Sequence, residues 1–327
     1  MILREYTIEK NDAGQRLDRF LTKQGLTIGV IRKALRNKDI KINGKREQAD
    51  CKLIEGDILR VYLKSDIPQP QPQKAKFHGV STNLNIIYED ENILLVDKPA
   101  GLLCHEDNFN NQDTLINRIK SYLYKKGEFF LVKTTDNCQL SIVNCFVPSL
   151  CNRIDRNTAG IVIAAKNAES LRVMNEKIKQ RQVTKLYLCI LAGVPKQKEA
   201  TLTAFLEKDE VANTVKISAK KTANSKTIIT KYRILDERGG LALAEINLLT
   251  GRTHQIRAHM AYIGCPLLGD GKYGRNKINK KYGFSKQALC SYKLAFDPAE
   301  ENNHLDYLDS RQFEVGRVWF LDKYYGF

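Results

Sequence analysis

The sequence predicts an α+β protein with a mixed, largely antiparallel sheet in its main domain and a small α+β domain ahead of it. Three observations lead to this prediction. Patterns typical of strands outnumber helical patterns, the two kinds do not alternate regularly, and a stretch rich in proline and glutamine divides the chain. Since 327 residues are long for one domain, we expect a small domain at 1–65, a linker at 66–82 and a large domain at 83–327.

The dividing stretch is Ile67–Gln73, in which proline and glutamine alternate. Three of the eight prolines of the chain lie there. Proline at this density favours an extended, polyproline-like spacer with little apolar surface to bury. The composition therefore predicts a linker rather than part of either core.

The small domain shows two helical patterns followed by strands. Apolar side chains at helical spacing predict one helix around Leu17–Leu21 and a second around Ile28–Leu35. Ile40–Ile42 alternates like a strand and runs into Asn43-Gly44, a strong hairpin signal. We expect a second strand pair to turn at Gly56-Asp57.

The second predicted helix carries Arg32, Lys33 and Arg36 on or near its polar face. Residues 1–65 hold 15 Lys and Arg against nine Asp and Glu, a surplus of six positive charges. Such a run is either a solvated helix face or a surface that contacts nucleic-acid phosphates.

In the large domain, most apolar runs are short and rich in β-branched residues. The predicted strands are Leu84–Tyr88, Ile93–Val96, Ile161–Ile163, Lys185–Leu191, Lys226–Leu235 and Leu241–Leu249. The predicted helices are Thr114–Tyr124, Ala168–Lys179 and His254–Ile263. Because these helices are too few to connect the strands one by one, a regular βαβ order is disfavoured.

The charge of the whole chain points to a polyanionic partner. The 53 Lys and Arg exceed the 37 Asp and Glu by 16, and the pI is near 9.4. Such a surplus favours nucleic acid over a membrane surface. No stretch approaches the ~20 apolar residues of a membrane span, and Met1–Glu5 begins no signal peptide. We expect a cytoplasmic monomer that binds nucleic acid and no membrane.

The cysteines and glycines indicate neither a metal nor a cofactor. Eight cysteines are scattered through apolar segments, and no two have Cys-x-x-Cys spacing. Buried, reduced thiols of a cytosolic protein explain them best. The chain also lacks the glycine-rich phosphate-binding patterns of nucleotide-binding loops.

A single carboxylate marks the candidate site. Asp155 lies between Arg153 and Arg156, in a turn-rich segment that leads into a predicted strand. Neighbouring cations keep a carboxylate ionised even where it is partly desolvated, as a nucleophile or general base requires. The alternative is a surface turn whose polar side chains bond their own backbone.

Four segments of the large domain resemble the RluA-type pseudouridine synthases. They are Leu95–Leu102, Asn152–Lys166, Lys185–Gly193 and Leu249–Gly274, the last containing Gly251-Arg252-Thr253-His254-Gln255-Ile256-Arg257. The small domain resembles the S4 RNA-binding domain in Arg16–Leu21 and in the hairpin Ile40–Lys45. The pairing of the two resembles the RluC- and RluD-like subgroup, which modifies large-subunit ribosomal RNA.

The resemblance implies a role for each matching residue. It implies that Asp155 is the catalytic aspartate, that Tyr187 stacks on the flipped base, and that Arg257 pairs with the aspartate. It also implies that Arg153 enters the RNA helix as the target nucleotide turns out, and that Leu289 lines the base pocket. Arg156 and Arg252 are expected to contact RNA, together with the basic helix residues Arg32, Lys33 and Arg36.

Four residues depart from the family pattern. Asn152 stands where His is common, Ala159 where Ser or Gly is common, and Cys290-Ser291 where His-Ala is usual. The first two lie beside the aspartate without carrying the chemistry, so we interpret them as subgroup variation. The segment 120–151 does not match the family closely and is either a loop that contacts RNA or a variable surface loop.

The implied reaction is the site-specific isomerisation of uridine to pseudouridine in structured RNA, with 23S ribosomal RNA as the expected substrate. After base flipping, the aspartate starts glycosidic cleavage, either by attacking the sugar or the base or by abstracting a sugar proton. The base then turns and rejoins the sugar through C5. Two other classes remain. One is a non-catalytic RNA-binding or ribosome assembly factor; the other is a metal hydrolase using His254, His259, Asp155 and Asp270.

Overall fold

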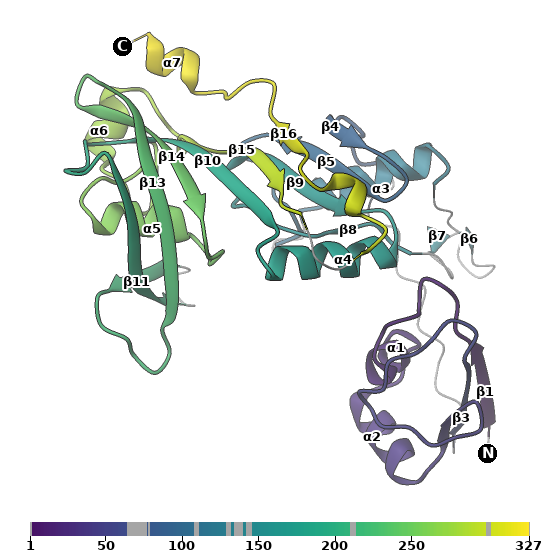
Figure 1. The fold of residues 1–327 in the computed structure, drawn as a ribbon. Helices are drawn as coiled ribbons and strands as arrows, with labels where there is room; N and C mark the ends of the chain where they lie inside the picture. Colours follow the sequence, from purple (N-terminus) through teal and green to yellow (C-terminus); the bar gives the residue numbers. More distant parts are fainter. Residues whose placement is uncertain are drawn as a thin grey trace. The chain divides into compact units, whose positions relative to one another are not determined.

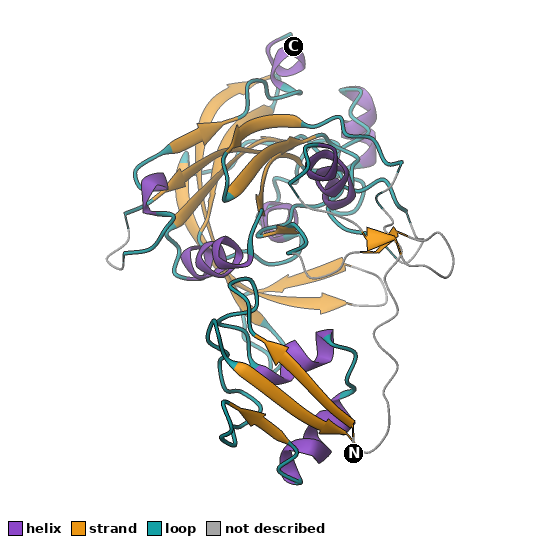
Figure 2. Cartoon of the chain, turned by 90° about the vertical axis from the view of Figure 1, so that its right-hand side faces the viewer, coloured by secondary structure: helices purple, strands orange, loops and turns teal. Residues whose placement is uncertain are grey.

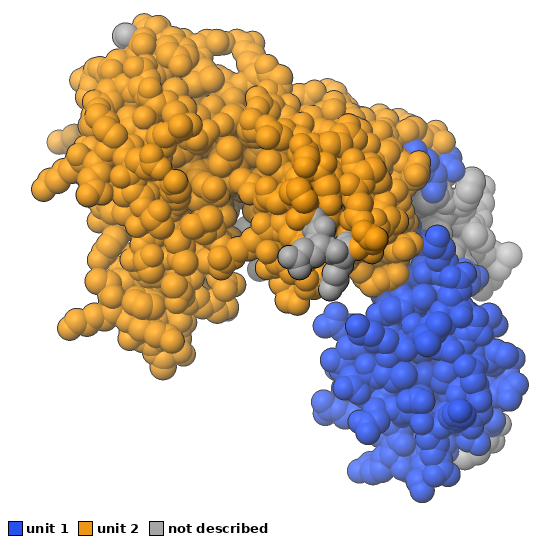
Figure 3. Space-filling view, viewed as in Figure 1, with its two compact units in different colours: residues 1–76, 127–147 blue, residues 77–126, 148–327 orange. Residues whose placement is uncertain are grey.

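The structure is a computed structural model that describes residues 2–63, 77, 79–107, 111–128, 132–133, 140–141, 146–209, 214–298 and 302–326. The chain forms two compact units, one of residues 1–76 with 127–147 and one of residues 77–126 with 148–327 (Figure 3). Most of the predicted linker at 66–82 lies outside the described residues, as does much of the segment 120–151. The domain boundaries therefore stay predictions.

The first unit holds a three-stranded antiparallel sheet in the order β1-β3-β2. The strands are β1 (Ile2–Thr7), β2 (Ile40–Ile42) and β3 (Ile58–Leu63), and the helices are α1 (Leu17–Lys23) and α2 (Ile28–Arg36). Both helices and the strand at 40–42 confirm the sequence predictions. The chain turns at Asn43-Gly44 with positive φ at both residues, as a two-residue hairpin requires.

The expected second hairpin of this unit is wrong. The chain does turn at Gly56-Asp57 before β3, but β3 pairs with β1 and β2 and with no strand just before the turn. The N-terminal strand β1, which the sequence analysis did not predict, supplies the second partner of β3. Long-range pairing of this kind leaves no local pattern in the sequence.

Helix α2 separates an apolar face from a basic one. Ile31 and Ala34 are buried in the core of the unit. Ile28, which the helical spacing placed on the same face, is 60% exposed in the first turn. The solvent-exposed basic residues of the helix are Arg32, Lys33 and Arg36.

The second unit is organised around one sheet of 11 described strands, in the order β12-β11-β13-β14-β10-β15-β9-β5-β4 (Figure 1). In addition, β16 pairs with β15 and β8 pairs with β9. The bounds are β4 Asn85–Glu89, β5 Ile93–Lys98, β8 Ser149–Leu150, β9 Ala159–Ala165, β10 Val183–Leu191, β11 Glu199–Asp209, β12 Thr214–Ser218, β13 Lys226–Arg238, β14 Leu241–Leu248, β15 Leu289–Phe296 and β16 Gln312–Glu314. The predicted α+β fold with a mixed, largely antiparallel sheet is thus confirmed.

Short helices flank this sheet (Figure 2). They are α3 Leu115–Lys125, α4 Ala168–Lys179, α5 Gln255–Tyr262, α6 Asn276–Lys281 and α7 Leu321–Tyr325, with a 3-10 turn at Asp306–Leu308. The first three confirm the predicted helices; the last two, with β8, β11, β12, β15 and β16, were not predicted as elements. Helix α5 packs against β11, β12 and β13. No helix in the described part of the chain is long and apolar enough to cross a membrane.

The two halves of the sheet meet where β15 runs parallel to β9. Cys290 pairs with Ala159 and Ser291 pairs with Gly160, while the other strand pairs of this sheet are antiparallel. A Cβ on Gly160 would lie 2.2 Å from the carbonyl oxygen of Ser291, so only glycine allows this approach. The glycine that closes the aspartate motif is therefore required for the joint between the halves.

Candidate functional site

Six of the predicted site residues line one pocket of about 680 Å³ in the second unit. They are Arg153, Asp155, Tyr187, Arg252, Arg257 and Leu289. Arg156 is not part of this lining, and the basic residues of α2 belong to the first unit. The structure thus gathers the residues that the resemblance assigned to catalysis and to the base pocket.

The joint between the sheet halves explains this gathering. Asp155 lies in the loop that enters β9, and Leu289 opens the neighbouring strand β15. Tyr187 of β10 faces Ser291 of β15 across the next antiparallel ladder. Consecutive strands of the sheet therefore bring an acid, an apolar residue and a tyrosine to the same pocket, although they are far apart in sequence.

Backbone contacts fix the loop that carries Asp155. The side chain of Lys98, at the end of β5, is fully buried and donates to the carbonyl oxygens of Pro99, Leu102 and Arg156 at 2.7–3.1 Å. Burial lowers the pKa of Lys98 to about 8. The conspicuous Asp-Lys-Pro-Ala-Gly segment thus supports the loop and does not line the pocket.

Asn152 also holds this loop, in the position where the family commonly has histidine. Its side-chain oxygen accepts the backbone N–H of Ile163 at 2.8 Å, which ties the loop to β9. A structural bond of this kind agrees with our interpretation of Asn152 as subgroup variation.

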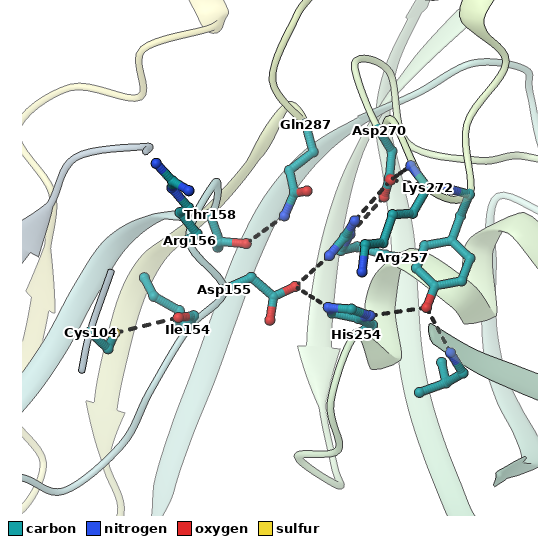
Figure 4. Close-up of polar contacts among 12 residues, drawn as sticks. Cys104, Ile154, Asp155, Arg156, Thr158, His254, Arg257, Asp270, Lys272 and Gln287 are labelled. Carbon is teal, nitrogen blue, oxygen red and sulfur yellow. Dashed lines mark hydrogen bonds and ion pairs between the residues drawn. The ribbon is translucent and has the colours of Figure 1, made fainter. Parts of the chain in front are cut away.

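Asp155 is linked to a buried ion pair (Figure 4). Nη1 of Arg257 donates to Oδ2 of Asp155 at 2.9 Å. Nε and Nη2 of the same guanidinium donate to the two carboxylate oxygens of Asp270 at 2.7 and 2.9 Å. One planar fork therefore orients two carboxylates, a geometry that lysine could not reproduce.

Of the three arginines expected near Asp155, Arg257 is the one that pairs with its carboxylate. Arg156 turns away from the Asp155 carboxylate, and its Nε donates to the carbonyl oxygen of Gly101 (Figure 4). Arg153 is exposed at the pocket wall. The ion pair comes from Arg257, which is 102 residues away in the chain. This pairing is the one that the family resemblance implied, and within the described residues neither flanking arginine is seen to contact the carboxylate.

Asp270 has no exposed surface, yet its pKa lies below the usual range. Burial alone would raise this pKa, but the Arg257 fork and the backbone N–H groups of Lys272 and Tyr273 lower it by more. The Asp270 carboxylate is consequently ionised at neutral pH. It binds Nε and Nη2 of Arg257 and leaves Nη1 to Asp155.

Tyr187 is a buried phenol at the pocket wall. It is 6% exposed, and burial above all, helped by the charge of Asp155, raises its pKa to about 12. The phenol is therefore protonated at neutral pH. Its ring offers a stacking platform, and a phenolate base is disfavoured in the resting site.

The metal-hydrolase alternative finds no support in the geometry. His259 is buried on α5, with Nδ1 at 3.0 Å from Oγ1 of Thr230, while Asp270 is fully engaged by Arg257. Among the residues that the structure describes, no group of three or more His, Cys, Asp or Glu is arranged to hold a metal ion.

Burial of His259 makes stability depend on pH. Burial lowers its pKa from 6.5 to about 4, so the unfolded chain binds a proton that the folded chain does not. We expect protonation of His259 to lower the free energy of unfolding by about 3 kcal/mol as the pH falls from neutral to ~4. Urea unfolding at a series of pH values measures it. His259→Asn, which keeps a partner for Thr230, should show a flatter curve; parallel curves would contradict the effect.

The sequence analysis assigned no synthase role to Asp270, His254 or Tyr273. Nδ1 of His254 lies 3.0 Å from the hydroxyl of Tyr273, and Nε2 lies 3.9 Å from Oδ2 of Asp155. All three stand in the fourth family-like segment, so the motif itself was the available signal. Their connection to Asp155 needed the fold.

The described cysteines, Cys51, Cys104, Cys151, Cys189, Cys265 and Cys290, are all free thiols. Four of them are buried and two are partly exposed. The remaining two, Cys138 and Cys145, lie outside the described residues.

Comparison with known proteins adds an independent finding. Residues 92–262 match the family model described as RNA pseudouridylate synthase. The "Ribosomal large subunit pseudouridine synthase C" of Rickettsia bellii is 33% identical over 80% of this chain and 84% of that protein. The protein of the same name in Vibrio cholerae is 29% identical over 90% and 89%. The structure of human RNA Pseudouridylate Synthase Domain Containing 4 shares the fold, with a TM-score of 0.55 at 21% identity over 73% of this chain and 90% of that one.

Proposed function

Since the chain belongs to the RNA pseudouridylate synthase family, we propose that it isomerises specific uridines of large-subunit ribosomal RNA to pseudouridine. The resemblance to RluA-type synthases is thereby confirmed. The names of the bacterial relatives support the ribosomal substrate. The observation that carries the proposal is the 2.9 Å contact between Asp155 and Arg257, in a pocket that Tyr187 also lines.

The pocket suits the chemistry of a flipped uracil. Turning a base out of the stack costs a few kcal/mol, and stacking on Tyr187 returns about 1–3 kcal/mol of it. Leu289 adds an apolar wall, and the hydrogen bond from Arg257 orients the carboxylate of Asp155. Arg252 at the wall contacts the RNA, and Arg153 fills the vacated stack. We also propose that the protein acts in the cytoplasm as a monomer.

Mapping pseudouridines on 23S ribosomal RNA tests the proposal. Unmodified transcript in EDTA, and separately ribosomal particles in the magnesium buffer that keeps them intact, are incubated with the protein without cofactor. Carbodiimide modification and primer extension then locate each pseudouridine as a stop. We expect a small number of new stops at defined uridines. Their absence from both substrates would contradict a ribosomal RNA substrate.

We propose that the first unit, through its S4-like helix α2, binds RNA phosphates. Arg32, Lys33 and Arg36 are exposed on one side of that helix. Changing all three to Gln should flatten the plot of log affinity against log salt by about 2–3 in slope, because each lost phosphate contact releases one fewer counterion. Filter binding between low and moderate salt measures it.

A matched control separates local contact from total charge. Helix α6 carries three exposed lysines, Lys277, Lys280 and Lys281, none of which lines the pocket. Their change to Gln removes the same charge and should leave most of the salt slope intact. An equal effect in both variants would show that α2 makes no specific contact.

A further inference from the structure

A continuous set of polar contacts leads from Asp155 to the backbone of strand β12. It runs from Oδ2 of Asp155 to Nε2 of His254 at 3.9 Å, and from Nδ1 of His254 to the hydroxyl of Tyr273 at 3.0 Å. The same hydroxyl accepts the backbone N–H of Val215 at 2.9 Å. Arg257 also lies over the ring of Tyr273, 5.3 Å from its centre. His254 is thus held on the side away from Asp155.

The chemistry of these groups determines where the imidazole proton lies. The amide of Val215 can only donate, so the Tyr273 oxygen accepts from it. The hydroxyl then has its own hydrogen to give, and Nδ1 of His254 is the partner at hydrogen-bond distance. The Tyr273 oxygen has room to accept a second hydrogen bond, so this contact alone allows either tautomer; Nε2, however, faces a carboxylate that only accepts. We therefore place the N–H on Nε2 and leave Nδ1 to accept from Tyr273.

Burial favours the neutral form of the His254 ring. Burial lowers the pKa of His254 first, and Arg257 and Lys272 lower it further. Asp155 and Asp270 act in the opposite direction without reversing the shift. A neutral donor has an advantage here. An imidazolium would add a second full cation beside a carboxylate that Arg257 already pairs, and so weaken it as a nucleophile or base.

The two oxygens of Asp155 are not equivalent. Oδ2 accepts a hydrogen bond from Arg257 and faces His254. Oδ1 has no hydrogen-bond partner within the described part of the chain. At 3.9 Å the His254 donor stands about 1 Å beyond a normal hydrogen bond, a gap that commonly closes when substrate binds.

We propose that His254 is a positioning residue: its neutral Nε2–H, fixed by Tyr273 and the Val215 amide, joins Arg257 in holding Oδ2 of Asp155, so that Oδ1 is left to react. This rests on the proposed role of Asp155. It assigns His254 a part in turnover and none in RNA affinity, because its donor reaches the carboxylate and not the RNA.

Two substitutions of His254 separate this role from a structural one. His254 has φ +53°, a left-handed conformation in which Asn is favoured over Gln. The amide of Gln, however, reaches the place of Nε2, whereas Asn reaches only the place of Nδ1. A positioning donor predicts that His254→Gln retains kcat within about threefold, while His254→Asn loses about 10- to 100-fold. A purely structural role predicts the reverse order.

The assay follows pseudouridine formation with RNA in excess, and the melting temperature of each variant verifies folding. KM for RNA should stay within about twofold in both variants. Equal kcat in His254→Asn and wild type would overturn the proposal, as would a rise in KM at constant kcat. Failure of the wider function looks different, because the wild-type protein itself would then form no pseudouridine; activity retained in Asp155→Asn would instead remove only the premise that Asp155 reacts.

A spectroscopic measurement tests the proton directly. Nitrogen-15 NMR of histidine-labelled protein distinguishes the two neutral tautomers and the imidazolium, and loss of one signal set in His254→Gln assigns the residue. We expect neutral imidazole with the proton on Nε2 at pH 7. In Tyr273→Phe the donor to Nδ1 is gone, so His254 should protonate at a higher pH than in wild type. A proton on Nδ1 at pH 7, or an unchanged titration in Tyr273→Phe, would overturn the proposal.

Discussion

Asp155→Asn is expected to abolish pseudouridine formation while RNA binding remains. The substitution is nearly isosteric, and the Asn oxygen still accepts from Nη1 of Arg257, so the loop and the ion pair behind it keep their arrangement. What disappears is the negative charge and the nucleophilic or basic oxygen. We expect turnover to fall on the order of 10⁴-fold or more, as for other residues that begin a covalent mechanism.

Single-turnover assays with excess enzyme measure this loss, and filter binding measures affinity, which should stay within about threefold because Asp155 contributes no cation to RNA contact. Asp113→Asn is the matched control: Asp113 also binds an arginine, Arg118, but lies outside the pocket. Its turnover should equal that of wild type. Turnover near wild type in Asp155→Asn would reject Asp155 as the catalyst.

Local patterns in the sequence were sufficient for most single elements. Helix α4 begins and ends at the predicted residues, and β10 extends its prediction by only two residues. Both elements are amphipathic or apolar over their whole length, so the pattern itself sets their limits. Strand β11, which was missed, has polar residues on an exposed face and a weaker pattern.

Pairings between distant segments were beyond the reach of such patterns. The parallel contact of β9 with β15 joins residues about 130 positions apart, and no local pattern in the sequence predicts such a pairing. The exposure of Ile28 shows the same limit on a smaller scale, since helical spacing does not tell where a core ends.

The site was predicted where a residue acts alone and missed where it acts through another. Asp155, Tyr187, Arg257 and Leu289 were named from the motifs, and the structure places all four in one pocket. The counter-charge that holds Arg257, by contrast, was considered only as a metal ligand. Whether a carboxylate binds a metal or a guanidinium depends on its neighbours in space.

The buried pair of Arg257 and Asp270 leads to the second large effect. In Arg257→Gln, Asp270 keeps no exposed surface but loses its cation, and Asp155 loses its partner. We expect turnover to fall about 10²- to 10³-fold, since a preorganised electrostatic contact is removed. The free energy of unfolding at pH 7 should fall by about 3–5 kcal/mol, the usual cost of stranding one buried charge.

The pH dependence of Asp270 should reverse in this variant. In the wild type its pKa is depressed, so its contribution to stability is present above the unfolded pKa of 3.8 and is lost as the pH falls through the lower folded pKa. Without Arg257, burial raises the pKa of Asp270 above the unfolded value. The variant should then gain stability relative to wild type as the pH is lowered from neutral toward 4, which urea unfolding can follow.

The double variant Arg257→Gln/Asp270→Asn separates stability from catalysis. Two neutral amides can hydrogen-bond to each other in the same space, so no buried charge is stranded. We expect most of the lost unfolding free energy to return, while turnover stays as low as in Arg257→Gln, because Asp155 still lacks its guanidinium. Recovery of both would mean that Arg257 serves only the fold; recovery of neither would mean that the charge of Asp270 is not what destabilises the single variant.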